Sequence, residues 1–110
     1  MAYSITYYDI NVQKQILALP ATLAARYVVL SGRMSVVGPN LGEPHTKAMG
    51  QGLFELRLKG AEGIARVFYC ALIGRRIIML HSFVKKTGKT PKRALELALN
   101  RMKDVRNEDT

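Results

Sequence analysis

The segment LHSFVKKTGKTPKRALELA, residues 80–98, joins the end of an expected strand to the start of an expected helix. In its first part His81, Phe83 and Lys85 alternate with other residues, so they share one face of the strand. The pair Thr90–Pro91 then offers an N-cap and a first-turn proline, which predict that a helix begins there. This transition predicts that the C-terminal part of the fold consists of a strand followed by a helix.

The residues on either side of this segment extend both elements. The expected helix carries an apolar stripe at helical spacing, which predicts that one of its faces packs on a sheet. The stripe consists of Leu95, Ala98, Leu99, Met102 and Val105. Upstream, strand patterns occur in LFELRLK (53–59), IARVFYCALI (64–73) and RIIMLHSFV (76–84), and their short connectors predict antiparallel hairpins.

The N-terminal third predicts a strand and two helices. Alternation over residues 3–7 is typical of a short strand. Asn11 is the expected cap of a helix over residues 12–19, which the step into Pro20 should end. A second helix is expected from Pro20 to about Val37. The following stretch, residues 38–52, is so rich in glycine and proline that we expect a loop.

The expected order is therefore strand, helix, helix, three strands and helix. It indicates one α+β domain over residues 1–110, with an N-terminal helical hairpin, an antiparallel β-sheet and a C-terminal helix. We expect the helices on one face of the sheet, which leaves the other face free for function.

Composition favours an anionic partner. Lysine and arginine number 17 against 8 acidic residues, a formal charge of +9, which suits nucleic acid, anionic lipid or an acidic protein. The single cysteine, Cys70, lies in an apolar run and is expected to pack as a small hydrophobic residue. The sequence shows neither a membrane-length apolar stretch nor a signal-peptide pattern, so we expect a soluble, cytosolic protein.

The chemistry-bearing residues are mainly cationic. His45 and His81 are far apart and lack metal-ligand spacing, so we expect no metal site and no cofactor. Arg66 interrupts an apolar strand, where a charge is costly unless it is paired. It either forms an ion pair with Glu55 across the sheet or binds an anion. If Arg57 shares the face of His81 and Phe83, the surface suits RNA, with Phe83 or Tyr69 available to stack on a base.

Three segments together resemble a known family. KAMGQGLFELR (47–57), IARVFY (64–69) and the segment 80–98 are similar to the RelE/HigB superfamily of toxin–antitoxin ribonucleases, in particular its phage-derived HigB-like branch. The resemblance implies a RelE-like fold and a metal-independent mRNA endoribonuclease that acts on the ribosome. It also implies a helix-turn-helix antitoxin as partner, and RNA cleavage by the RNA's own 2′-hydroxyl.

The resemblance also suggests roles for individual residues. Arg57 and Arg66 match strand cations that hold the scissile phosphate, Lys85 and Lys86 match a basic pair after the last strand, and His81 is the nearby group that titrates near neutrality. The expected catalytic residues are thus Arg57, Arg66, His81, Lys85 and Lys86, and the expected RNA-binding residues are Lys47, Phe83, Lys89 and Lys92.

The sequence allows alternatives for the activity and for the partner's docking site. Relatives often carry an acidic residue where this chain has Ala94, so a catalytically silent RNA-binding or protein-binding regulator of the same fold is the alternative function. We expect the antitoxin to cover the basic surface, with the stripe of the last helix as a second possible docking site. A membrane-binding function is disfavoured because the helices need their apolar faces for the sheet.

Overall fold

The computed structural model describes residues 2–85 and 89–109 as a five-stranded sheet with three helices. In chain order the elements are β1 (Ser4–Tyr7), α1 (Ile10–Leu17), α2 (Ala21–Val37), β2 (Thr46–Gly50), β3 (Leu53–Gly60), β4 (Gly63–Leu72), β5 (Arg76–Lys85) and α3 (Lys92–Asp109). The α+β class, the three central strands and the C-terminal helix are confirmed.

The sheet is mixed rather than antiparallel throughout. Its strand order is β1-β5-β4-β3-β2, and the pairs among β2 to β5 are antiparallel. Strand β1 pairs in parallel with β5, from Ser4 opposite Arg76 to Tyr7 opposite Met79. The prediction of a purely antiparallel sheet is wrong at this edge, because short connectors say nothing about how a distant N-terminal strand joins.

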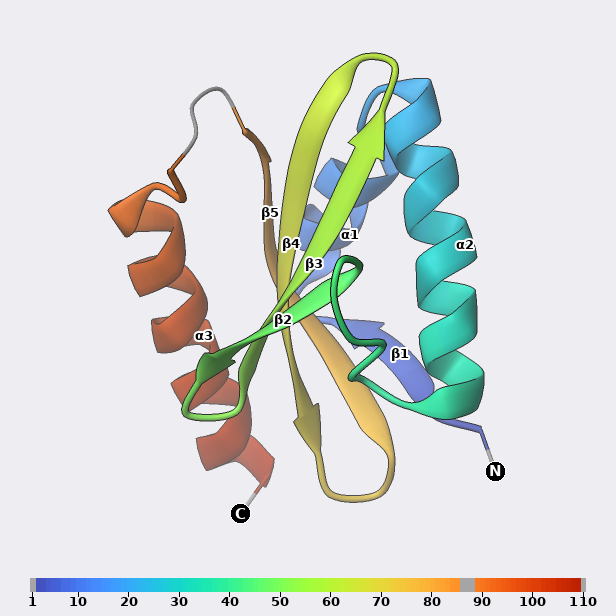
Figure 1. Cartoon of the computed structure of the whole chain (residues 1–110). Coiled ribbons are helices and arrows are strands. Elements are labelled where there is room, and N and C mark those ends of the chain that lie inside the picture. Colours follow the sequence, from blue (N-terminus) through green and yellow to red (C-terminus); the bar gives the residue numbers. More distant parts are fainter. Residues whose placement is uncertain (1, 86–88, 110) are drawn as a thin grey trace.

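Helices cover both faces of the sheet, so the prediction of a single covered face is wrong. Figure 1 shows the sheet between α2 on the right and α3 on the left. The physical reason lies in β4, where Val67 and Tyr69 are buried on the α2 side while Phe68 and Cys70 are buried on the α3 side. A strand that is apolar on both faces requires cover on both.

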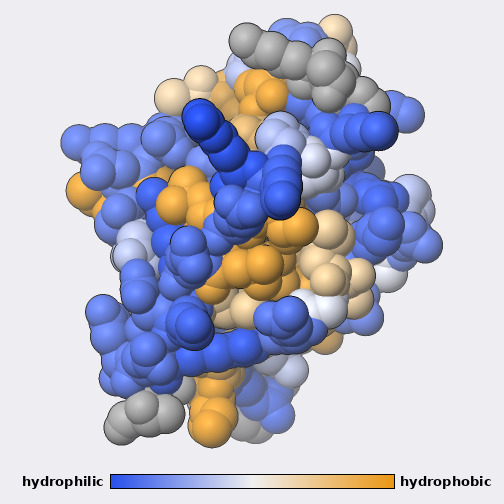
Figure 2. Space-filling model, turned by 90° about the vertical axis from the view of Figure 1, so that its left-hand side faces the viewer, coloured by the Kyte–Doolittle hydropathy of each residue, from blue (hydrophilic) through white to orange (hydrophobic). Residues whose placement is uncertain are grey.

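Each face has its own core. On the α2 side the buried residues include Leu23, Tyr27, Leu30, Met34, Leu56, Leu58, Val67 and Ile77. On the α3 side they include Leu53, Phe68, Cys70, Leu80, Ala94, Ala98 and Met102. The stripe of α3 therefore packs on the sheet, as expected, and is not the exposed docking site considered as an alternative. Figure 2 shows the α3 side, where an apolar patch in the middle is surrounded by hydrophilic side chains.

Two details of the α3-side core resolve sequence questions. Ala94 is 6% exposed and lies in this core, so an alanine here serves packing, whereas a carboxylate at the same position would have to be buried. Cys70 is fully buried, and burial raises the pKa of its thiol to about 11. The prediction that Cys70 packs as a hydrophobic residue is confirmed.

The N-terminal helices differ from prediction at their ends. The N-cap of α1 is Asp9, whose side chain accepts a hydrogen bond from the Val12 N–H at 2.9 Å. The prediction of Asn11 as cap is therefore wrong, and the helix starts earlier than expected. Pro20 precedes α2, as predicted. Within the described chain no single helix is long and apolar enough to cross a membrane; α1 and α2 pass that test only together, and the chain bends by 119° between them.

The stretch 38–52 contains a strand, so its prediction as a loop is wrong. Strand β2 pairs antiparallel with β3, with Lys47 opposite Glu55. The residues Gly50, Gln51 and Gly52, which connect the two strands, have φ angles of 93°, 59° and 88°. Glycine adopts positive φ angles without steric cost, so Gly50 and Gly52 mark the tight turn of a hairpin, in which Gln51 also takes a left-handed conformation.

The separation of the two cores gives a stability prediction. Leu30 is fully buried on the α2 side and Met102 is 3% exposed on the α3 side. We expect Leu30→Ala and Met102→Ala each to lower the free energy of unfolding by about 2–5 kcal/mol, because each leaves a cavity. The double variant should lose about the sum, whereas Val28→Ala, at a residue 62% exposed, should lose little. Urea unfolding measures all four; coupling above about 1 kcal/mol would mean that the cores are not independent.

Candidate nucleic-acid interface

The strand register brings most of the predicted site residues to one face of the sheet. Arg57 on β3 lies opposite Arg66 on β4, and Arg66 lies opposite Phe83 on β5. The neighbouring cross-strand rows on the same face are Lys47, Glu55, Phe68 and His81 on one side, and Lys59, Ile64 and Lys85 on the other. All three rows project to the α3 side, because residues two apart in a strand share a face. The condition that Arg57 shares the face of His81 and Phe83 is met.

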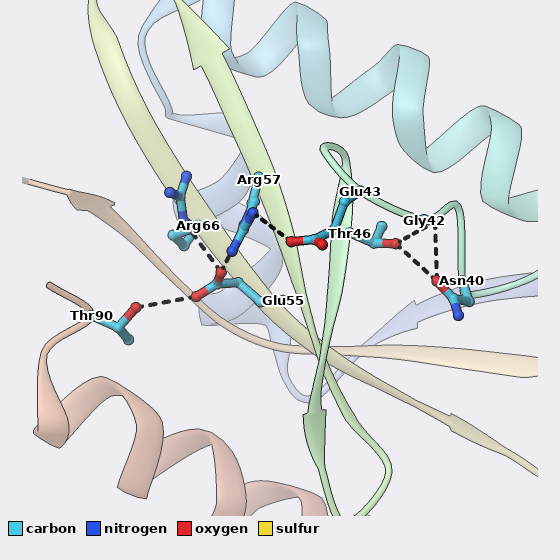
Figure 3. Close-up of polar contacts among 8 residues, drawn as sticks. All are labelled: Asn40, Gly42, Glu43, Thr46, Glu55, Arg57, Arg66 and Thr90. Carbon is cyan, nitrogen blue, oxygen red and sulfur yellow. Dashed lines mark hydrogen bonds and ion pairs between the residues drawn. The ribbon is translucent and has the colours of Figure 1, made fainter. Parts of the chain in front are cut away.

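A buried carboxylate lies at the centre of this surface. The Glu55 side chain is 3% exposed, and its Oε1 accepts a hydrogen bond from Arg57 Nε at 3.2 Å. The same oxygen is 3.5 Å from Arg66 Nε, while Oε2 accepts from the Thr90 hydroxyl at 3.2 Å. Figure 3 shows these three side chains pointing toward Glu55 from β3, β4 and the residues before α3. The ion pair considered for Arg66 is therefore present.

Arg66 is held in a partly buried position. Its side chain is 12% exposed, and its Nη1 donates to the Ala65 carbonyl at 3.3 Å. Burial is the main cause that lowers the pKa of Arg66; the Glu55 carboxylate opposes this shift and the Arg57 charge adds to it. Two guanidinium groups thus share one carboxylate, which leaves a surplus of positive charge.

Arg57 has a second, weaker partner. Its Nη1 is 3.3 Å from Glu43 Oε1, but the Glu43 side chain is 68% exposed. Exposed ion pairs contribute little and are screened by salt. An incoming anion can therefore displace Glu43 far more easily than it can displace Glu55.

A depression of about 290 Å³ lies beside the two arginines. It is lined by Arg26, Pro44, His45, Arg57, Lys59, Ile64 and Arg66. Four of these residues are cations, so the depression is suited to an anion.

Three of the lining residues were missed by sequence reasoning. Lys59 continues the alternation of Glu55 and Arg57 along β3, and this signal would have sufficed to find it. Arg26 lies on α2, and no local pattern shows that this helix passes close to the edge of β3. His45 lies beside Arg57 because its backbone carbonyl accepts a hydrogen bond from the Arg57 N–H at 2.8 Å.

His81 lies near the arginines along the sheet but lines a different depression. Its ring stacks on Phe83, with ring centroids 6.0 Å apart. Together with Ser82 and Val84, both residues line a depression of about 380 Å³, which is completed by residues 15 and 18–20. The structure thus places His81 and Phe83 beside, and not within, the depression at Arg57 and Arg66.

The surroundings of His81 favour its neutral form. Burial is the larger cause that lowers the pKa of His81, and the charge of Arg101 lowers it further. Its Nδ1 is buried and has no hydrogen-bond partner among the described residues. Arg101 itself is fixed by donating to the Leu80 carbonyl at 2.8 Å. At neutral pH the imidazole is therefore a neutral group with a proton-accepting nitrogen.

The remaining predicted residues lie around this surface. Lys47 is exposed on β2, and Lys85 is partly buried at the end of β5. Lys89 and Lys92 are exposed near the start of α3, with Lys92 4.0 Å from Glu96. Lys86 lies outside the described residues.

Tyr69 cannot stack on a base from this face. It is fully buried on the α2 side, where its ring stacks on Phe54 and its hydroxyl donates to the Pro39 carbonyl. The suggestion that Tyr69 serves as a stacking residue is therefore wrong. The continuous apolar run in β4 hid which of its residues face which side.

The side chains gathered here offer cations and an imidazole. Among residues 2–85 and 89–109, no three His, Cys, Asp or Glu side chains lie together as metal ligands would. Arginine presents several N–H donors in a planar fork that fits phosphate oxygens. The arrangement is therefore chemically suited to hold a phosphate group.

Comparison with known proteins agrees with this architecture. A family model described as phage-derived protein Gp49-like (DUF891) matches residues 14–103. No curated protein matches the chain. The matched residues include α2, all of β2 to β5 and most of α3, so they contain every strand of the sheet except β1, together with the cationic surface. The chain therefore belongs to the phage-derived Gp49-like family, which is in general a family of RelE/HigB-like toxins of toxin–antitoxin systems.

Proposed function

We propose that this chain is a HigB-like toxin of a type II toxin–antitoxin pair and an endoribonuclease that cuts messenger RNA on the ribosome, in the cytosol. The observation that carries the proposal is the depression lined by Arg26, Arg57, Lys59 and Arg66. Four cations around one small hollow suit a phosphate of an RNA backbone. Family membership supplies the antitoxin as a partner.

The two strand arginines are arranged to hold the scissile phosphate. Glu55 contacts the Nε atom of each guanidinium, so the terminal nitrogens can turn to phosphate oxygens. Because Glu55 is itself fixed by Thr90, it positions both forks before RNA arrives. Such preorganised charge stabilises a phosphorane without reorganisation during the reaction.

The proposed reaction uses the RNA's own 2′-hydroxyl as nucleophile. A base removes its proton, the 2′-oxygen bonds to phosphorus, and the bond from phosphorus to the 5′-oxygen breaks. The electron pair stays on the 5′-oxygen, which takes up a proton, and the products are a cyclic phosphate and a 5′-hydroxyl end. This chemistry needs a base, an acid and positive charge, and metal ions have no part in it.

His81 is the candidate base: it lines the neighbouring depression one cross-strand row from Arg66, and the causes that lower its pKa keep it neutral at pH 7. Lys85 lies four residues further along the same strand face and is the candidate proton donor to the 5′-oxygen. Glu55 is less suited to proton transfer, because both of its oxygens are already in contact with neighbouring donors. We assign it the positioning of Arg57 and Arg66.

The flanking RNA would follow the exposed lysines. Lys47 lies one cross-strand row from Arg57, while Lys89 and Lys92 lie near the start of α3. Phe83 packs against the rings of Phe68 and His81. Its first role is therefore to support His81, and only its exposed edge is offered to a base.

The alternative is a catalytically silent binding protein of the same fold. The contact between Arg66 and Glu55 is the observation that favours it, because a structural ion pair alone would explain an arginine in this strand. Activity and stability measured on the same variant separate the two functions.

Replacement of Arg66 gives the first functional prediction. We expect Arg66→Ala to slow single-turnover cleavage of ribosome-bound mRNA by about 10²–10³-fold, the usual cost of losing one preorganised contact. Arg66→Lys should restore little of the cleavage rate, because the compact charge of a lysine cannot replace the paired N–H donors of the planar guanidinium. Lys103→Ala, on the exposed side of α3, is the matched control and should cleave normally. A folded Arg66→Ala protein with the wild-type rate would refute the assignment; loss of activity only above a lowered melting temperature would favour the structural ion pair.

The environment of His81 predicts a specific pH dependence. Its pKa lies below the ordinary value of 6.5 in the folded chain, so the unfolded chain binds more protons as the pH falls below that value. We therefore expect the free energy of unfolding to decrease from pH 7.5 to pH 5.5 (about one unit on either side of the unperturbed pKa). In the His81→Gln variant the free energy of unfolding should fall less between these two pH values, because the titrating imidazole is gone. The same substitution should slow RNA cleavage by about 10²–10⁴-fold. Urea unfolding of both proteins at the two pH values gives the answer; an unchanged pH dependence in the variant contradicts the stated cause.

The salt dependence of RNA binding tests whether this surface contacts phosphate groups. We expect the affinity for single-stranded RNA to fall with salt, with a slope of about −0.7 for each phosphate contact on a log–log plot. Lys47→Ala and Lys92→Ala should each make the slope less steep by about 0.7, whereas Lys103→Ala should leave it unchanged. Fluorescence anisotropy at several salt concentrations measures the slope. An affinity that does not depend on salt would exclude a phosphate-binding surface.

A further inference from the structure

The outward side of α2 is apolar along nearly its whole length. Leu23, Tyr27, Leu30 and Met34 face the sheet and are buried. On the opposite side of the helix, the residues are Ala21, Ala25, Val28, Val29, Gly32 and Val36, and all six are exposed. The valines at 28, 29 and 36 are 62%, 53% and 68% exposed. A surface helix normally turns a polar face to water, so this apolar side requires an explanation.

Nothing in the described chain covers this side of α2. In Figure 1 the helix lies at the outside of the molecule, with the sheet on its inner side only. A Cβ atom added at Gly32 would meet no atom within 4 Å. On the other side of the sheet, α3 contributes only Leu97, 37% exposed, to the large exposed apolar residues. Four of the large exposed apolar residues lie on α2, namely Val28, Val29, Val36 and Val37, whereas Ile10, Leu17, Ile73 and Val84 are distributed over other elements.

The charged residues that α2 itself contributes to this surface are arginines, and a nearby carboxylate, Glu62, accepts hydrogen bonds from Thr22 in the first turn. Residues 10–42 contain no aspartate or glutamate. Arg26 and Arg33 are two helical turns apart, so they lie along the same flank of α2, beside the valines. Both side chains reach solvent, Arg33 more fully than Arg26. The surface is thus an apolar strip with a cationic border.

We infer that the outward side of α2 binds an amphipathic helix of a partner protein, and that acidic residues flank the apolar face of that helix. The apolar strip buries the partner's hydrophobic residues, and Arg26 and Arg33 pair with its carboxylates. Helix packing on a surface of valine, alanine and glycine allows close approach of the two backbones. The cognate antitoxin is the class of partner that family membership implies.

Two other occupants fit the surface less well. A second copy of the chain would bring the same arginine flank and another net charge of +9 to the interface, so like charges would face each other. An anionic membrane favours helices with bulky Trp, Phe and Leu on the buried side, whereas this side of α2 carries small residues and valine. An acidic helix satisfies both the shape and the charge.

The inference does not depend on the proposed RNA cleavage, and its test uses no RNA. The probe is a blocked helical peptide as long as α2, with leucine and alanine on one face and glutamate on both flanks. The control peptide carries lysine in place of glutamate. Binding to the full chain is measured by fluorescence anisotropy and checked by calorimetry.

We expect the glutamate peptide to bind and the lysine peptide to bind at least tenfold more weakly. The double variant Val29→Ser/Val36→Ser should lose at least tenfold in affinity, while Leu97→Ser, an exposed apolar residue on α3, is the matched control and should bind as wild type. Arg33→Glu should lower the affinity for the glutamate peptide and raise the affinity for the lysine peptide. The substituted residues are all exposed, and thermal melting verifies that each variant is folded.

Several outcomes would overturn the inference. These are no binding of the glutamate peptide, equal binding of both peptides, or binding unaffected by the valine substitutions. Self-association of the wild type that the double variant abolishes, measured by sedimentation, would assign the surface to a second copy. Valine-dependent binding to phosphatidylserine vesicles without peptide binding would assign it to a membrane.

Discussion

The arrangement of the cationic face depends on one buried carboxylate. Glu55 joins β3, β4 and the start of α3, because it contacts Arg57, Arg66 and Thr90 at the same time. Without it, two guanidinium groups would face each other across neighbouring strands, and removal of one partner from a buried ion pair is costly. The residue thus allows two like charges to lie side by side where an anion can reach both, and it ties the helix start to that place.

The strand register extends this local order to the whole face. Alternation along β3, β4 and β5 places Glu55, Arg57 and Lys59 in line with His81, Phe83 and Lys85. Toward the other end of the same face, Phe68, Cys70 and Leu80 are covered by α3. One side of one sheet therefore contains both a core and an open cationic surface, and the position of α3 sets the boundary. The opposite side of the sheet, covered by α2, contains a hydrophobic core.

Local sequence patterns predicted where the helices and strands lie along the chain. They predicted less well which of these elements lie next to each other in space. The alternation in residues 53–59 and the step at Thr90–Pro91 each depend on a few consecutive residues, so the sequence alone revealed β3 and the start of α3. The parallel pairing of β1 and the approach of Arg26 to β3 depend on contacts distant along the chain, and no local pattern contains them. The same limit applies to the site, where Arg57 and Arg66 were expected together but the separate surroundings of His81 were not.

The shape of β5 has a consequence for self-association. In the described part of the chain, β1 pairs with β5 only as far as Met79, so from Leu80 to Lys85 one side of β5 has no strand partner, and only the end of α1 with the residues after it lies beside this edge. Exposed edges can recruit a strand from another molecule, and charged residues on an edge oppose this. Lys85 and the high net positive charge make two such edges repel each other. The cations proposed to bind RNA would then also keep copies of this protein from pairing edge to edge in the absence of RNA.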